Sequence, residues 1–139
     1  MQAMNLLHRV ALAASGGRLG AKLGNMPVYK VTTTGRTSGR RRTVMLTVPI
    51  IRDGIHVFVA SKGGDDRHPD WYRNMIAHSE ITVEWVGGGT PIAMVARTAS
   101  AEEKAELWPQ IVAAYRGYEG YQSSTDRDIP VVLAEPVSG

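Results

Sequence analysis

The stretch that decides the fold is TVMLTVPII (residues 43–51), followed by Arg52-Asp53-Gly54 and then IHVFVAS (residues 55–61). Both runs are rich in β-branched residues, and an Asp-Gly pair between two such runs is a strong hairpin signal. We therefore expect an antiparallel hairpin with its turn near Asp53. In that register Thr43 would face a residue close to Gly63.

Outside this hairpin the chain alternates between strand and helix patterns. Residues 28–34, 80–86, 91–99 and 129–136 are expected as strands, and residues 69–78 and 101–115 as helices. A capping box of Ser100 and Glu103 starts the second helix, and Pro109 is expected to kink it. Only one strand pair is separated by a helix that could make a parallel crossover, so the sequence predicts an α+β fold with a small antiparallel β-barrel and peripheral helices.

The first 25 residues are expected to form an N-terminal helix and a glycine-rich linker, and residues 26–139 the main domain. The apolar run VALAA is too short for a secretory signal, and no run approaches the roughly 20 residues needed to span a bilayer. The helix could pack on its own domain, on a partner subunit or on a membrane surface. The residues leave this choice open.

Composition excludes several classes of protein. The chain has 139 residues, one domain in length, and no cysteine, which rules out disulfides, thiol catalysis and cysteine-ligated metals. The four histidines show no metal-ligand spacing, so no metal site is expected. No dinucleotide fingerprint, phosphate-binding P-loop or serine elbow is present.

Basic residues gather in one part of the chain. Nine basic and four acidic residues lie between Lys30 and Arg73, against three basic and seven acidic residues from Glu102 onward. The loop GRTSGRRR (residues 35–42) combines glycines, hydroxyls and four arginines, which suits an anion; a solvated basic loop is the alternative. The expected hairpin would bring Lys62 to the same end, making one composite anion site.

Two aromatic groups are candidate ligand contacts. Trp71 and Asn74 share one face of the first expected helix; core packing is the default interpretation of Trp71, and a planar ligand held against Trp71 with Asn74 as polar anchor is the alternative. Tyr115, Tyr118 and Tyr121 are spaced by three across Gly117 and Gly120, a pattern that suggests a mobile aromatic flap over a ligand or a further piece of core.

Four strings of this sequence together carry a resemblance: VTTTGRTSGRRRTVML, VASKGGDDRHPDWYRN, WPQIVAAYRGYEGY and TDRDIPVVLAEP. In this order they resemble the deazaflavin-dependent nitroreductases, the actinobacterial reductases that use reduced coenzyme F420 (F420H2). The resemblance implies a split β-barrel related to the flavin-binding barrels of pyridoxamine-phosphate-oxidase type. It also implies hydride transfer from the deazaflavin, whose phosphate and polyglutamate tail are strongly anionic, to a flat electron-poor acceptor.

The resemblance also implies site residues. Arg36, Thr37, Ser38 and Arg42 would hold the phosphate and tail, with Lys62 adding charge. The other cofactor-binding residues implied are Thr43, Val44, Met45, Leu46, Val59, Ala60, Ser61, Gly63, Asp70, Trp71, Tyr72, Arg73 and Asn74. The substrate would meet Trp71, Tyr115, Tyr118 and Tyr121, and Ser61, Tyr118 and Tyr121 are the candidate catalytic hydrogen-bond or proton donors.

Other functions remain open at this stage. The same barrel could use FMN, and a small nucleic-acid-binding barrel is a further alternative, although the acidic C-terminal half and the 6% aromatic content speak against it. We expect a small-molecule acceptor, which could be a quinone, a nitroaromatic or an unsaturated lactone, and no nucleic acid. We expect a cytoplasmic enzyme; peripheral contact with the inner face of the membrane and the oligomeric state are left open.

Overall fold

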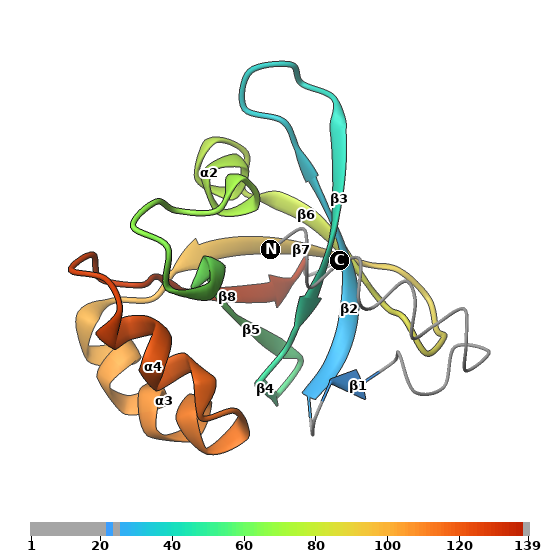
Figure 1. The fold of residues 1–139 in the computed structure, drawn as a ribbon. Coiled ribbons are helices and arrows are strands. Elements are labelled where there is room, and N and C mark those ends of the chain that lie inside the picture. The colour runs from blue at the N-terminus through green and yellow to red at the C-terminus, as the bar shows by residue number, and fades with distance from the viewer. Residues whose placement is uncertain (1–21, 24–25, 138–139) are drawn as a thin grey trace.

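A computed structural model of the chain describes residues 22–23 and 26–137 (Figure 1). The strands are β1 (Lys22–Leu23), β2 (Met26–Thr34), β3 (Arg41–Thr47), β4 (Ile50–Arg52), β5 (Ile55–Val59), β6 (Glu80–Trp85), β7 (Ile92–Thr98) and β8 (Val131–Pro136). The helices are a short 3-10 turn η2 (Lys62–Gly64), α2 (Asp70–Ala77), α3 (Ala101–Ala114) and α4 (Gly117–Ser123). The expected N-terminal helix lies outside the described residues.

All strand pairs that the structure describes are antiparallel, and together they form one curled sheet. The order is β1-β2-β6-β7-β8-β5-β4, with β3 added to β2. Helix α2 lies on one side of this sheet and α3 with α4 on another (Figure 1). The predicted α+β fold, a small antiparallel barrel with peripheral helices, is confirmed, and its sheet is curled into a half-barrel.

The predicted hairpin is correct around its turn and wrong beyond it. Ile50 pairs with Val57 and Arg52 with Ile55 across the Asp-Gly turn, as expected. The first run, however, divides at Val48–Pro49 into two strands, and β3 pairs with β2, so that Thr43 faces Thr32. Thr43 therefore does not face Gly63, and the Arg36 and Lys62 loops do not meet at the end of one hairpin. Proline has no N–H to donate to a ladder, which is why the chain changes partner there.

The sheet separates two apolar clusters. Phe58, Ala60, Val132 and Ala134 belong to the cluster that α2 covers, with Trp71 and Met75. Val57, Val59, Val131 and Leu133 belong to the cluster beneath α3 and α4, with Ile111 and Tyr118. Successive side chains of a strand point to opposite faces, so β5 and β8 are buried on both sides and connect the two clusters.

Two helices, α3 and α4, lie near the C-terminus. The capping box at the start of α3 forms as predicted: Glu103 N donates to Ser100 Oγ and Ser100 N to Glu103 Oε1. The tyrosine segment forms a helix, α4, and Tyr118, only 4% exposed, is part of the core, one of the two alternatives that the sequence left open for this segment. Gly120 leaves the helical path intact.

One further difference concerns the expected N-terminal linker. Two residues of the expected linker, Lys22 and Leu23, form β1 and pair with Pro27 and Met26 of β2. Within the part of the chain that the structure describes, no helix has the length and apolar character that crossing a membrane requires.

Candidate active site

The arginine loop of residues 35–40 joins β2 to β3 and projects from the sheet (Figure 1). Gly35 N donates to Arg40 O at 2.8 Å and Gly39 N to Gly35 O at 2.9 Å, which closes the turn. A Cβ at Gly35 would lie 2.7 Å from Ser38 Oγ, and Gly39 has a φ of 71°. The backbone at Gly39 thus favours glycine, and a side chain at Gly35 would require Ser38 to move.

Arg36 ties this loop to α2. Its backbone N–H and its Nη1 both donate to Asn74 Oδ1, at 3.1 and 3.0 Å, and its Nη2 donates to Asp70 Oδ1 at 3.2 Å. Asn74 is 5% exposed and its Nδ2 lies 3.4 Å from Thr33 Oγ1. The structure thus brings three predicted cofactor residues together, but it uses the Arg36 guanidinium for an internal contact.

The side chains of the other arginines in this region are exposed to solvent. Arg40, Arg41 and Arg42 are exposed, and of these only Arg41 has a side-chain hydrogen bond to another described residue, a long one of 3.4 Å to Thr82 Oγ1. None of the three forms an ion pair with any residue in the described ranges. Thr37 and Ser38 are exposed beside them. This leaves a cationic surface free to take an anion.

The segment after β5 has an unusual backbone. Lys62, Gly63 and Gly64 have φ values of 46°, 63° and 86°, all in the left-handed region. A Cβ on Gly64 would lie 3.0 Å from Tyr121 O, so the turn packs directly on α4. Ser61 is 1% exposed and its Oγ has no partner among the described residues. A buried hydroxyl without a partner costs free energy that a ligand could recover.

The three predicted tyrosines form one aromatic cluster, with ring centroids 5.2 to 6.2 Å apart. Tyr118 is buried, its OH lies 3.0 Å from Thr47 Oγ1, and burial raises its pKa to about 12. The OH of Tyr121 lies 3.3 Å from that of Tyr115, and this hydrogen bond, followed by burial, raises the Tyr121 pKa to about 12. Both phenols are therefore protonated at neutral pH and able to donate a hydrogen bond.

The remaining predicted residues lie on two sides of the sheet. Val44, Leu46 and Ala60 pack with the α2 cluster, and Val59 with the α4 cluster. Because side chains alternate along β3, Met45 points to the same face as Thr43 and Thr47, the residue that bonds Tyr118. Val44, Met45 and Leu46 therefore do not line one surface with their side chains.

Trp71 and Tyr72 are core residues of the α2 side. Trp71 is 5% exposed, its ring lies 6.4 Å from that of Phe58, and its Nε1 has no partner among the described residues. Tyr72 donates or accepts a 2.8 Å hydrogen bond with Thr98 Oγ1. Their neighbour Arg73 is exposed, like Asp70 and Gly63.

A cavity of about 230 Å³ lies between α2 and β7. Its lining residues are Tyr72, Met75, Ile76, Ser79, Ala96, Arg97, Thr98 and Val132. Tyr72 is the one predicted site residue among them, so this cavity is separate from the tyrosine cluster. The described residues contain no group of three or more histidine, aspartate or glutamate side chains placed to hold a metal ion.

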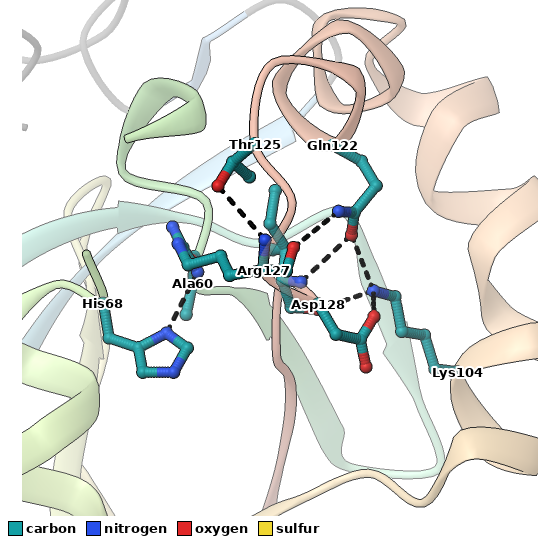
Figure 2. Close-up of polar contacts among 8 residues, drawn as sticks. Ala60, His68, Lys104, Gln122, Thr125, Arg127 and Asp128 are labelled. Atoms are coloured by element: carbon teal, nitrogen blue, oxygen red, sulfur yellow. Dashed lines mark hydrogen bonds and ion pairs between the residues drawn. The ribbon is translucent and has the colours of Figure 1, made fainter. Parts of the chain in front are cut away.

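Sequence reasoning missed a polar network that follows α4 (Figure 2). Arg127 reaches the carbonyl oxygens of Ala60, Ser61 and Asp65, and its Nη1 lies 3.0 Å from His68 Nδ1. Gln122 Nε2 donates to Arg127 O at 2.8 Å and Gln122 Oε1 accepts from Lys104 Nζ at 2.9 Å. The partners of Arg127 lie about 60 residues away along the chain, and no local pattern marks such contacts.

Known proteins with similar sequences identify the family of this chain. The family model described as F420H2-dependent quinone reductase matches residues 6–136. The chain belongs to this family. An F420H2-dependent quinone reductase of Mycobacterium tuberculosis strain H37Rv is 36% identical over 133 residues, which cover 91% of this chain and 86% of that protein. The predicted resemblance to F420H2-dependent reductases is confirmed.

Solved structures agree with the fold. An F420H2-dependent reductase called FDR-A superposes with a TM-score of 0.70 at 40% identity, covering 78% of this chain and 94% of its own. A Clostridium acetobutylicum protein of the pyridoxine-phosphate oxidase family superposes with a TM-score of 0.54 at 11% identity, covering 94% of this chain and 82% of its own. At that identity the second likeness shows the fold alone, and it confirms the predicted split barrel.

Proposed function

We propose that this protein is a reductase that uses F420H2 and passes a hydride to a quinone-type acceptor. When bound, the deazaflavin supplies the two electrons as hydride. Family membership supports the cofactor, and the unpaired cationic surface of Arg40, Arg41 and Arg42 carries the proposal in this chain. A cofactor with a phosphate and a polyglutamate tail needs such a surface, and exposed guanidinium groups bind carboxylate and phosphate in a bidentate manner.

The segment after β5 also fits this cofactor. The buried Ser61 Oγ has no hydrogen-bond partner among the described residues, and Lys62 beside it adds a positive charge. We assign Ser61 the role of a hydrogen-bond partner of the bound ring. Thr43 and Met45 project from β3 to the face of Thr47 and Tyr118, and we assign the ring and the acceptor to this face.

Tyrosines of α4 would serve the acceptor. Tyr115 is exposed and Tyr121 is partly buried, and the phenol of Tyr121 stays protonated because its pKa is raised to about 12. A protonated phenol can donate a hydrogen bond to an acceptor oxygen on which negative charge develops. Tyr118 is already bonded to Thr47, so its part is to hold β3 against α4.

Titration of the purified protein with F420, followed by tryptophan fluorescence, tests the cofactor. The variant Arg42→Ala should weaken F420 binding by about tenfold or more, because a charge-assisted hydrogen bond contributes roughly 1.5–3 kcal/mol. Its unfolding midpoint should stay close to that of the unmodified protein, since Arg42 is exposed at the start of β3. Arg52→Ala, at the β4–β5 turn, is the matched control and should bind F420 normally.

The acceptor is tested by F420H2 oxidation with a quinone, a nitroaromatic and an unsaturated lactone. Turnover with the quinone supports the proposal. Binding of FMN in place of F420, or turnover only with the other two acceptors, would contradict it.

A further inference from the structure

The turn at residues 61–64 is a strained piece of backbone. Lys62 has a φ of 46°, and it is followed by two glycines that also have positive φ. Such conformations persist only where the surroundings fix them. Two local hydrogen bonds, Gly64 N to Ser61 O at 2.9 Å and Asp65 N to Lys62 O at 3.1 Å, are too few to do so alone. Something outside the turn must hold it.

Arg127 supplies this hold from the segment between α4 and β8 (Figure 2). Its Nε donates to Asp65 O at 2.7 Å, its Nη2 to Ser61 O at 2.8 Å and its Nη1 to Ala60 O at 3.2 Å. These carbonyls lie on both sides of the left-handed residues. The planar fork of one guanidinium thus fixes the entry and the exit of the turn together, which a lysine cannot do.

Arg127 is used for backbone contacts and not for an ion pair. Asp65 and Asp66 lie near enough to act on its charge, but no carboxylate oxygen in the described ranges lies within ion-pair distance of it. Thr125 Oγ1 donates to Asp66 Oδ1 at 2.8 Å, a second tie between the same two segments. The segment that carries Arg127 is itself anchored, because Gln122 Nε2 donates to Arg127 O.

We propose that Arg127 is the positioning residue of the cofactor-contacting turn: it fixes the backbone of residues 60–65 and thereby places Ser61 and Lys62 for the acidic cofactor. The inference rests on the proposed function, in which Ser61 and Lys62 of this turn contact F420. It adds a residue that the sequence had not pointed to.

Arg127→Lys and Arg127→Ala test the proposal against Lys104→Met. Lys104 anchors the same C-terminal segment through Gln122, Asp128 and Ile129 O, and it has no hydrogen bond or ion pair with the described residues 60–68. A general loosening of the C-terminal segment would therefore show in both sets of variants. Loss of the guanidinium fork would show only in the Arg127 variants.

Hydrogen exchange of the amides of Gly64 and Asp65 is the first readout, and it needs no cofactor. Exchange at these amides should rise at least about tenfold in both Arg127 variants, while the amides of β5 keep their protection. In Lys104→Met the two amides should exchange as in the unmodified protein. Unchanged exchange in Arg127→Ala would overturn the proposal.

The NMR titration of His68 is a second readout of the same contact. Burial first, and then the charges of Arg127 and Arg73, lower the pKa of His68, whose ring also contacts Tyr72. In Arg127→Ala this pKa should move up toward the ordinary histidine value. An unchanged His68 pKa in Arg127→Ala would contradict the close approach of the two side chains on which the proposal depends.

F420 titration completes the test. The dissociation constant should rise about tenfold in Arg127→Lys and stay unchanged in Lys104→Met. Faster loop exchange with unchanged F420 affinity would overturn the positioning role. If the unmodified protein bound no F420, both the proposed function and the positioning role of Arg127 would be wrong. If the unmodified protein bound F420 but the Gly64 and Asp65 amides exchanged normally in Arg127→Ala, only the positioning role would be wrong.

Discussion

At the scale of single residues, His56 is a titratable group enclosed in the core. It lies in β5 with 4% of its surface exposed, and its ring meets that of Tyr29 edge-on at 4.8 Å. The Nδ1 atom lies 3.1 Å from Gly54 O, so the neutral ring donates there and leaves Nε2 without a partner among the described residues. A proton on Nε2 would bury an unpaired N–H together with a charge.

This environment predicts a pH dependence of stability. Burial lowers the pKa of His56 below its ordinary value of 6.5, so the unfolded chain binds the proton more readily than the folded one. The free energy of unfolding should therefore be highest above about pH 6.5 and should decrease as the pH falls below it, toward the folded-state pKa. Urea unfolding between about pH 7.5 and about pH 5.5 measures the slope.

The variant His56→Gln should show a shallower slope than the unmodified protein, since it removes the titrating ring. His78→Gln, at an exposed position after α2, is the control and should keep the original slope. A His56→Gln slope equal to that of the unmodified protein would contradict the assignment.

At the scale of elements, the β2–β3 loop and α2 are joined by the contacts of Arg36 with Asn74 and Asp70, and the Asn74 amide makes two of them. Asn74 Oδ1 accepts both the backbone and the side-chain N–H groups of Arg36, and Asn74 is buried. The loop carries the cationic surface proposed for the cofactor, so its orientation depends on this contact.

Asn74→Ala should lower the free energy of unfolding by about 1–3 kcal/mol, because it leaves the Arg36 backbone N–H without its acceptor. Arg40→Ala, at an exposed position of the same loop, should change stability by no more than about 0.5 kcal/mol. Urea unfolding of both variants compares them directly. Equal stability of the two would show that the amide contact contributes nothing.

Element prediction from the sequence succeeded where the signal was local. The Asp-Gly turn and the Ser100–Glu103 capping box depend on residues a few positions apart, and both formed as expected. The prediction of the strand that pairs with β3 was wrong, because the run of residues 43–51 shows strand propensity but does not show which strand it will pair with. Pro49 was the available signal: it marked the position at which one strand became two.

The candidate site shows the same limit. The resemblance implied Arg36, Asp70 and Asn74 as cofactor-binding residues without saying that they contact one another. In the structure Arg36 is hydrogen-bonded to both Asn74 and Asp70. Arg127 was missed, because its partners at residues 60–68 are brought to it only by the pairing of β5 with β8. Long-range contacts of this kind follow from topology and not from spacing.

At the scale of the whole molecule, the two apolar clusters share β5 and β8. Phe58 faces Val132 on the α2 side, and Val57 faces Leu133 on the α4 side. Trp71 belongs to the first cluster, and Trp108 packs against the second. Because the same two strands complete both clusters, neither should unfold without the other.

The variants Trp71→Phe and Trp108→Phe test this cooperativity. In each, the fluorescence of the remaining tryptophans and the far-UV circular dichroism should give the same denaturation midpoint, as expected for a single two-state unit. Midpoints that separate between the two probes would show that the α2 side and the α3–α4 side unfold independently.

The outer edge of β3 has a consequence for handling the protein. Among the described strands β3 pairs only with β2, and exposed Arg41 and Arg42 stand at the start of this edge strand. Mutual repulsion of such guanidinium groups discourages two molecules from joining edge to edge into a larger ribbon. Alanine variants of Arg41 and Arg42, made to weaken cofactor binding, would also lose this repulsion between molecules. Such variants should therefore aggregate more readily and should be kept dilute.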